Sequence, residues 1–149
     1  MNQKDRAQRP IGYWLKRTDE ALTTHINSAL SEQGLTRFHW QALNILHQAG
    51  VTTQDQILAE MRDFVTVVEL EDILAAFEQQ GWVMRRPGAS TPAELELTDA
   101  GRQGHASALR VQTEVRKRAV EGVSQEEYLT VIRVLERIVA NLEGGNAAS

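Results

Sequence analysis

Apolar residues recur every three or four positions along most of the chain, a spacing that predicts amphipathic helices. Glycines follow several of these stretches, where a helix ends readily in a left-handed residue, and threonine or serine precedes the next stretch. Two starts, Thr66 with Glu69 and Ser124 with Glu127, have the spacing of a capping box. We therefore predict six helices, over residues 11–33, 36–49, 53–62, 66–80, 98–121 and 124–143, with loose tails over 1–10 and 144–149.

One part of the chain has the two-residue period of a β-strand. Residues 93–97 alternate Glu with Leu, residues 82–86 form a second short run, and the loop 87–92 between them contains turn-forming residues. A hairpin that directly follows a helix–turn–helix makes a winged helix. The predicted fold is mostly α-helical with a small β-hairpin wing, in one domain over 1–149. Residues 34–97 form the winged helix-turn-helix, and 1–33 and 98–149 form flanking helices.

The last predicted helix carries more apolar surface than one small domain needs to cover. Its apolar residues keep a three-to-four spacing over two heptads. We predict that this helix and the first one pair with a second copy of the chain as a homodimer seam. The alternative is an ordinary core helix within one chain. The predicted dimerisation residues are Ile11, Tyr128, Ile132, Leu135, Ile138, Val139 and Leu142.

Composition narrows the class of protein. Of 149 residues, 42% are apolar and 24% are charged, which indicates a globular chain. The absence of cysteine excludes disulfides, Cys-ligated metal sites and thiol chemistry. The chain begins with a polar segment and has no apolar run approaching ~18 residues, so we expect a cytoplasmic protein without a signal peptide or a membrane partner.

The charge is unevenly distributed along the chain. The net charge of −4 and the pI near 5.6 argue, taken as totals, against binding to nucleic acid. Residues 53–81 contain one base, Arg62, and seven acids, whereas residues 1–17 carry a net +4 and residues 98–118 a net +3. The acidic excess therefore falls on the two predicted helices of the helix–turn–helix.

Three short stretches resemble the MarR family of ligand-responsive winged-helix regulators. They are Gly34-Leu-Thr-Arg-Phe-His-Trp-Gln-Ala-Leu43, Gly81-Trp-Val-Met-Arg-Arg86 and Leu97-Thr-Asp-Ala-Gly-Arg102, and the similarity extends in consistent order over about residues 11–143. This resemblance implies an obligate homodimer that binds double-stranded operator DNA through helix 66–80 and the wing. It also implies release of the DNA by a small ligand bound near the junction of the dimer and DNA-binding parts.

The predicted DNA-reading positions depart from the family pattern. A face that reads DNA ordinarily carries basic or amide side chains, whereas helix 66–80 presents Val68, Glu69 and Asp72, and the loop 87–92 carries no charge. The alternative function is a winged-helix protein that has lost ordinary DNA readout and uses this acidic helix to bind another protein, or that only binds a ligand. The predicted DNA-binding residues are Arg37, Thr53, Gln54, Arg62, Thr66, Val68, Glu69, Asp72, Arg85 and Arg86.

Polar and aromatic residues of the helices 11–33, 36–49 and 98–121 suggest a site for a small aromatic or phenolic ligand. They are Tyr13, Trp14, Arg17, His39, Trp40 and His105; in the alternative interpretation, Trp14 and Trp40 are core residues and His39 bonds to the backbone at a helix cap. The four histidines lack the i, i+4 spacing of a zinc pair, so we expect no metal and no cofactor. No catalytic motif occurs, so we expect that the protein is not an enzyme.

Overall fold

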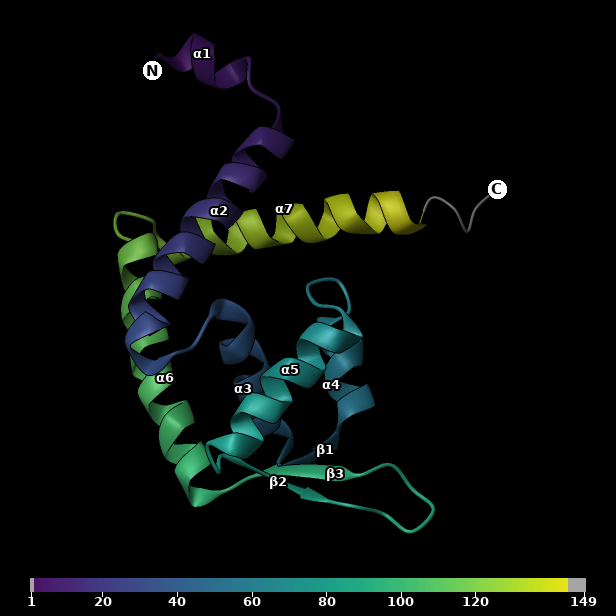
Figure 1. Cartoon of the computed structure of the whole chain (residues 1–149). Helices are drawn as coiled ribbons and strands as arrows, with labels where there is room; N and C mark the ends of the chain where they lie inside the picture. The colour runs from purple at the N-terminus through teal and green to yellow at the C-terminus, as the bar shows by residue number, and fades with distance from the viewer. Residues whose placement is uncertain (1, 145–149) are drawn as a thin grey trace. The chain divides into compact units, whose positions relative to one another are not determined.

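The computed structural model describes residues 2–144, which form α-helices and one small sheet (Figure 1). Two compact units divide between residues 115 and 116, inside α6. No helix of the described chain is both long enough and apolar enough to cross a membrane. In chain order the elements are α1 (Gln3–Ala7), α2 (Ile11–Leu30), the 3-10 helix η1 (Ser31–Gln33), α3 (Arg37–Ala49), β1 (Val51–Thr53), α4 (Gln54–Met61), α5 (Val67–Gln79), β2 (Val83–Arg86), β3 (Glu94–Leu97), α6 (Asp99–Ala119) and α7 (Gln125–Gly144).

The six predicted helices and the hairpin are confirmed, with ends close to those predicted. Both predicted capping boxes are present, and four glycines that follow helices have positive φ, from 70° at Gly34 to 77° at Gly122. One prediction was wrong for part of the N-terminal tail, because Asn2 and Asp5 form a capping box that starts α1. Gly144 is the last residue of α7, and 145–149 lie outside the described residues.

The sheet has three strands rather than the two predicted, in the order β1-β3-β2 with antiparallel neighbours. The third strand, β1, pairs Val51 with Glu96 and Thr53 with Glu94, so β3 lies in the middle. Its last residue, Thr53, is also the N-cap of α4. The sequence pattern therefore predicted the start of this helix correctly but missed the three residues of strand before it.

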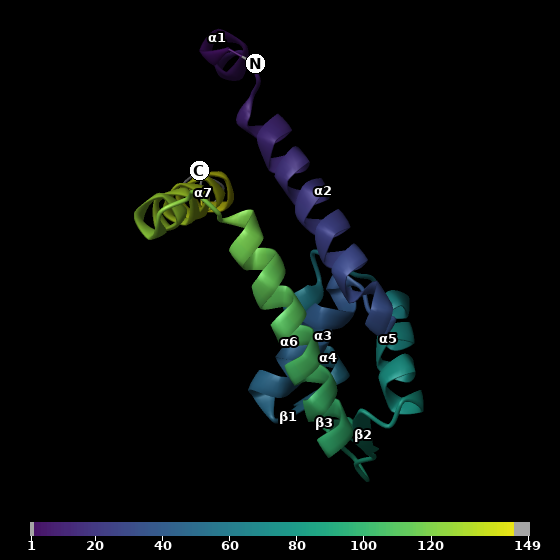
Figure 2. The same ribbon diagram turned by 90° about the vertical axis from the view of Figure 1, so that its left-hand side faces the viewer.

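The core of the first unit, residues 2–115, joins the sheet to the helices. Leu43 and Leu46 of α3, Ile57 of α4, Leu70 of α5 and Leu95 of β3 are completely buried and belong to one cluster. Figures 1 and 2 show α3, α4 and α5 on one side of the sheet, with the β2–β3 hairpin extending from it. This core holds the helix–turn–helix and the wing together as one winged helix.

The second unit, residues 116–144, consists of the end of α6, a turn and α7. Gly122 takes a φ of 77° in the turn, and Ser124 then caps α7: its hydroxyl accepts from the Glu127 amide at 3.0 Å. The Ser124 amide donates to the Glu127 carboxylate, also at 3.0 Å, and this bond lowers the pKa of Glu127. The Arg116 guanidinium lies 5.3 Å from the centre of the Tyr128 ring, which ties the end of α6 to α7.

Candidate nucleic-acid interface

The solvent face of α5 carries acidic and apolar side chains and no base. Leu70, Ile73, Leu74 and Phe77 are buried, which confirms the predicted inner face. On the other side, 65% of Val68 and 48% of Val67 are exposed to solvent. We call the exposed side chains that follow the helix cap in the first part of α5 the α5 face; they are Val67, Val68, Glu71, Asp72 and Ala75. The hydrogen-bonding side chains of this face, Glu71 and Asp72, are acceptors when ionised. Gln79, which carries an amide donor, is also exposed, at the last residue of the helix.

Glu69 belongs to the helix cap rather than to this reading surface. The Thr66 amide donates to the Glu69 carboxylate at 3.1 Å, and the Glu69 amide donates to the Thr66 hydroxyl at 3.2 Å. The first backbone N–H groups of a helix have no hydrogen-bond partner within the helix. These two hydrogen bonds supply partners for the amides of Thr66 and Glu69. Thr66 and Glu69, both predicted as DNA-binding residues, therefore have a structural role in fixing the start of α5.

Three predicted phosphate-binding arginines are paired with carboxylates. The Arg85 Nε and terminal nitrogen both lie 2.8 Å from Oε1 of Glu78, and Arg86 lies 3.0 Å from Glu96. The Arg37 guanidinium lies 2.8 Å from Asp19, away from the wing and against α2. Surface ion pairs contribute only about 0–1 kcal/mol, so an arginine at the wing can exchange its carboxylate for a phosphate at little cost.

The start of α4 offers backbone donors, and an exposed base follows the last residue of the same helix. The Thr53 hydroxyl accepts from the Gln56 amide at 3.2 Å, and Gln54, half-buried, is the first helical residue. Arg62 is exposed at the end of this helix and makes no ion pair with any residue in the range 2–144. Helix starts of this kind bind phosphate through free N–H groups and the helix dipole.

Sequence reasoning did not include Phe64 and Val67 among the functional residues. Phe64 lies in the turn between α4 and α5 and is 56% exposed, although its neighbour Val65 is buried. Val67 and Val68, three and four residues later, are exposed as well, so three apolar side chains near the start of α5 are open to solvent. The signal was available in the sequence, because Phe64 occupies a turn position where polar residues are usual.

The residues predicted to bind a ligand fall into separate groups. Tyr13 and Trp14 are in edge-to-face contact near the start of α2, with a centroid distance of 5.1 Å, and the Arg9 guanidinium lies 4.5 Å from the Tyr13 ring. Arg17 is exposed one turn further along α2. Trp40 and His105 instead stack on each other at 5.3 Å between α3 and α6.

His39 has the role that the alternative interpretation gave it. Its Nδ1 accepts from the Thr36 amide at 3.2 Å, at the start of α3. Because Nδ1 is the acceptor, the neutral ring carries its proton on Nε2. Burial lowers the pKa of His39, which favours this neutral form.

Three stacked rings join α3 to α6. His105 is 3% exposed, and its ring stacks on those of both Trp40 and His47. The rings of His47 and His105 are nearly parallel, and their centres are only 3.8 Å apart. His105 Nε2 lies 3.0 Å from the Asn44 Oδ1, to which it donates. Burial lowers the pKa of His105, and the neighbouring His47 lowers it further. His47 was not predicted as a functional residue.

No group of three or more His, Asp and Glu side chains within 2–144 is placed to hold a metal ion.

The stretch Leu97 to Arg102, which connects the wing to α6, is a structural junction. The Thr98 amide donates to the Trp82 carbonyl at 2.9 Å, and the Thr98 hydroxyl accepts from the Gly101 amide at 3.1 Å. A Cβ atom on Gly101 would lie 2.1 Å from the same Trp82 carbonyl oxygen. Glycine is therefore required where α6 passes the start of β2.

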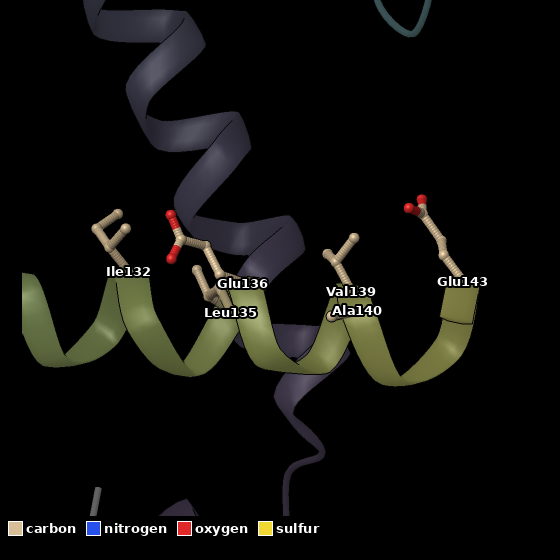
Figure 3. A pocket seen from close by; sticks show the side chains of 6 residues that line it. All are labelled: Ile132, Leu135, Glu136, Val139, Ala140 and Glu143. Atoms are coloured by element: carbon tan, nitrogen blue, oxygen red, sulfur yellow. The ribbon is translucent and has the colours of Figure 1, made fainter. Parts of the chain in front are cut away.

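The predicted dimerisation stripe lies on an uncovered helix. Among the described residues no side chain of α7 is buried; Val139 is 51% and Leu142 74% exposed. Ile132, Leu135, Glu136, Val139, Ala140 and Glu143 line a surface hollow of about 470 Å³ along one side of α7 (Figure 3). Ile11, at the start of α2, is 53% exposed.

Comparison of the sequence with protein-family models and with curated proteins gives no match. Solved structures match over nearly the whole chain. A mutant MarR from Escherichia coli complexed with operator DNA has a TM-score of 0.76 at 16% identity, over 93% of this chain and 99% of that one. A MarR family protein from Mycobacterium tuberculosis in complex with DNA has a TM-score of 0.70 at 25% identity, over 88% and 98%. A probable transcriptional regulator from Pseudomonas aeruginosa has a TM-score of 0.76 at 20% identity, over 89% and 98%. This chain has the winged-helix fold of the MarR-family transcriptional regulators.

Proposed function

We propose that this protein is a DNA-binding transcriptional regulator that acts as a homodimer. The observation that carries the proposal is the fold: its helix order and wing match regulators that were crystallised on DNA, over at least 88% of this chain. In a helix–turn–helix the second helix enters the major groove with its N-terminal residues at the base edges. In this chain that helix is α5, and the exposed residues at its start are Val67 and Val68.

Phosphate contacts are available on both sides of α5. The first turn of α4, beginning at Gln54, presents backbone N–H groups, and Arg62, which has no ion pair within the described residues, lies at the other end of the same helix. Arg85 and Arg86 lie on β2 at the base of the wing, where each can turn from its carboxylate to a phosphate. These groups supply the sequence-independent part of the affinity.

The test is binding of the ligand-free protein to duplex DNA from its own upstream region, measured by fluorescence anisotropy over a salt series from 50 to 300 mM. We expect log K to fall linearly with log salt, with a slope of about −0.9 for each phosphate contacted. A duplex of the same length and scrambled sequence is the control for specificity. Absence of binding at 50 mM salt, or a flat slope, would overturn the proposal.

The dimer is proposed from the uncovered apolar stripe of α7. Leu135 is half-buried and lies between Ile132 and Val139 in the hollow of this helix. Leu135→Asp puts a charge on the proposed seam, and Arg137→Asp puts the same charge on the opposite side of the helix. We expect sedimentation analysis to show monomers or insoluble protein for Leu135→Asp and dimers for Arg137→Asp. A soluble, dimeric Leu135→Asp protein contradicts this seam.

Response to a small aromatic or phenolic ligand is proposed at the start of α2. Tyr13 and Trp14 offer ring faces, and Arg17 offers a charge for an acid group. Trp40 and His105 are already stacked on each other, so we leave them out of the proposed ligand site. Titration with benzoate and with phenol should quench tryptophan fluorescence in the wild type and not in Trp14→Phe. Equal quenching in both proteins would contradict a site at α2.

One observation favours a second function, in which α5 binds a protein. Phe64, Val67 and Val68 are exposed apolar side chains within five residues of the chain, in a segment that carries one base and seven acids. Such a surface is complementary to an apolar surface bordered by bases. This function predicts no salt-dependent DNA binding, so the same salt series distinguishes it from the first.

A further inference from the structure

The α5 face has an unusual hydrogen-bonding character for a helix that reads DNA. Its polar side chains, Glu71 and Asp72, can only accept hydrogen bonds, and its other exposed residues are Val67, Val68 and Ala75. No donor side chain stands among these five. The charges of Glu69 and Glu78, on the same helix, are already engaged by the Thr66 amide and by Arg85.

The edges of the bases in the major groove differ in what they offer such a face. Guanine presents two acceptors, N7 and O6, which an acceptor-only surface repels. Adenine N6 and cytosine N4 are amino donors, and thymine presents a methyl group. A carboxylate can accept from an amino group, and a valine can pack against a methyl group. The α5 face therefore complements amino and methyl groups and excludes the guanine edge.

The spacing on the helix fits neighbouring base pairs. Val68 and Asp72 are four residues apart, so they lie on the same side of α5, about 6 Å apart along its axis. Successive base pairs are separated by about 3.4 Å. One helix can thus place Val68 against a methyl group and Asp72 against an amino group that belong to base pairs one or two steps apart.

We propose that α5 reads operator DNA by the thymine methyl groups and the amino groups of adenine or cytosine, through Val68 and Asp72 respectively. This inference rests on the proposed DNA-binding function and specifies its sequence preference. It explains how an acidic helix can serve a DNA-binding fold: the carboxylates repel phosphate in non-specific positions and gain an amino partner only in the correct sequence. The selectivity comes from rejecting wrong sequences as much as from binding the right one.

The experiment starts from a selection. The full-length wild-type protein selects duplexes from a random library at 50 mM salt, and the preferred duplex is then synthesised in two forms. One form carries thymine, and the other carries deoxyuridine at the same positions, which removes only the methyl groups. Binding of both forms is measured for the wild type, Val68→Ala and the control Val123→Ala, which shortens a valine that is 44% exposed in the turn before α7.

We expect the wild type and Val123→Ala to bind the deoxyuridine duplex about fourfold more weakly for each contacted methyl group. We expect a smaller difference between the two duplexes for Val68→Ala, whose shorter side chain loses most of the contact. We expect Asp72→Asn, whose amide can also donate, to lose about tenfold of its discrimination against guanine substitutions in the selected site. Val68 is exposed, so circular dichroism should show an unchanged fold for Val68→Ala.

The outcomes separate the two proposals. If no duplex is selected, the DNA-binding function itself fails, and a protein partner for α5 becomes the better explanation. If duplexes are selected but the wild type binds thymine and deoxyuridine forms equally, DNA binding stands and readout by Val68 is overturned. If Asp72→Asn keeps the full discrimination against guanine, the role of Asp72 is overturned.

Discussion

Gly101 and Gly104 face Trp82, and replacing each with alanine tests the junction between α6 and the wing. The Cβ of alanine at 101 would lie 2.1 Å from the Trp82 carbonyl oxygen, a backbone atom that also accepts from the Thr98 amide at 2.9 Å. At 104 the nearest atoms, at 2.8 Å, belong to the Trp82 indole ring, which can move as a side chain. The two substitutions therefore meet obstacles of different stiffness.

The magnitude follows from these contacts. Overpacking costs about 1–3 kcal/mol, and losing the Thr98 hydrogen bond adds about 1 kcal/mol for Gly101→Ala. Alanine in place of glycine within a helix returns about 1 kcal/mol to both variants. We expect a loss of about 2 kcal/mol or more for Gly101→Ala, which lowers Tm by roughly 4–8 °C, and a smaller loss for Gly104→Ala.

Urea unfolding followed by circular dichroism measures the free energy of unfolding of each variant. Gly12→Ala is the matched control, because Gly12 is also helical and a Cβ there meets nothing within 4 Å. It should be as stable as the wild type or gain up to about 1 kcal/mol. The reasoning fails if Gly101→Ala is as stable as Gly12→Ala, or if Gly104→Ala is the more damaging of the two core-facing changes.

Two further predictions concern charge. Burial and His47 lower the pKa of His105 in the fold, so the neutral ring contributes stability that is present above the unfolded pKa of about 6.5 and is lost as pH falls below it. The Tm should decrease from pH 7.5 to 5.5. The decrease should be smaller in His105→Gln than in the control His25→Gln, which replaces an exposed histidine. Equal decreases in the two variants would contradict this role of His105. Arg85→Gln removes one proposed phosphate contact, so the salt slope of DNA binding should become shallower by about 0.9 per protomer. The Tm should change little, because a surface ion pair such as that of Arg85 with Glu78 contributes only about 0–1 kcal/mol. An unchanged slope would place Arg85 away from phosphate.

Local signals in the sequence defined most of the fold. The capping boxes at Thr66 and Ser124 and the positive-φ glycines at 34, 50, 81 and 122 set helix ends through contacts between residues close in the chain. Strand β1 escaped prediction because its three residues become a strand only by pairing with β3, more than 40 residues later. A distant partner of this kind leaves no periodic signal in so short a segment.

The interface was predictable only where it depends on residues close together in the chain. The exposed face of α5 followed from helix periodicity, since Leu70, Ile73, Leu74 and Phe77 define the buried side. The carboxylate partners of Arg85 and Arg86 could not be predicted in this way, because Glu78 and Glu96 approach them only once α5 and β3 have packed beside β2. His47 and His105 likewise come from α3 and α6 and meet only in the folded chain.

The buried ring of Phe77 has a mechanical consequence. It contacts His39 of α3 edge-to-face and stacks on Trp82 at the entry to β2, each with a centroid distance of 5.9 Å. Rotation of α5 about its own axis would break both contacts together, and Trp82 in turn is held against Gly104 of α6. The orientation of α5 is thus coupled to the position of the wing. The same packed rings fix the angle at which α5 presents Val68 and the direction in which the hairpin extends.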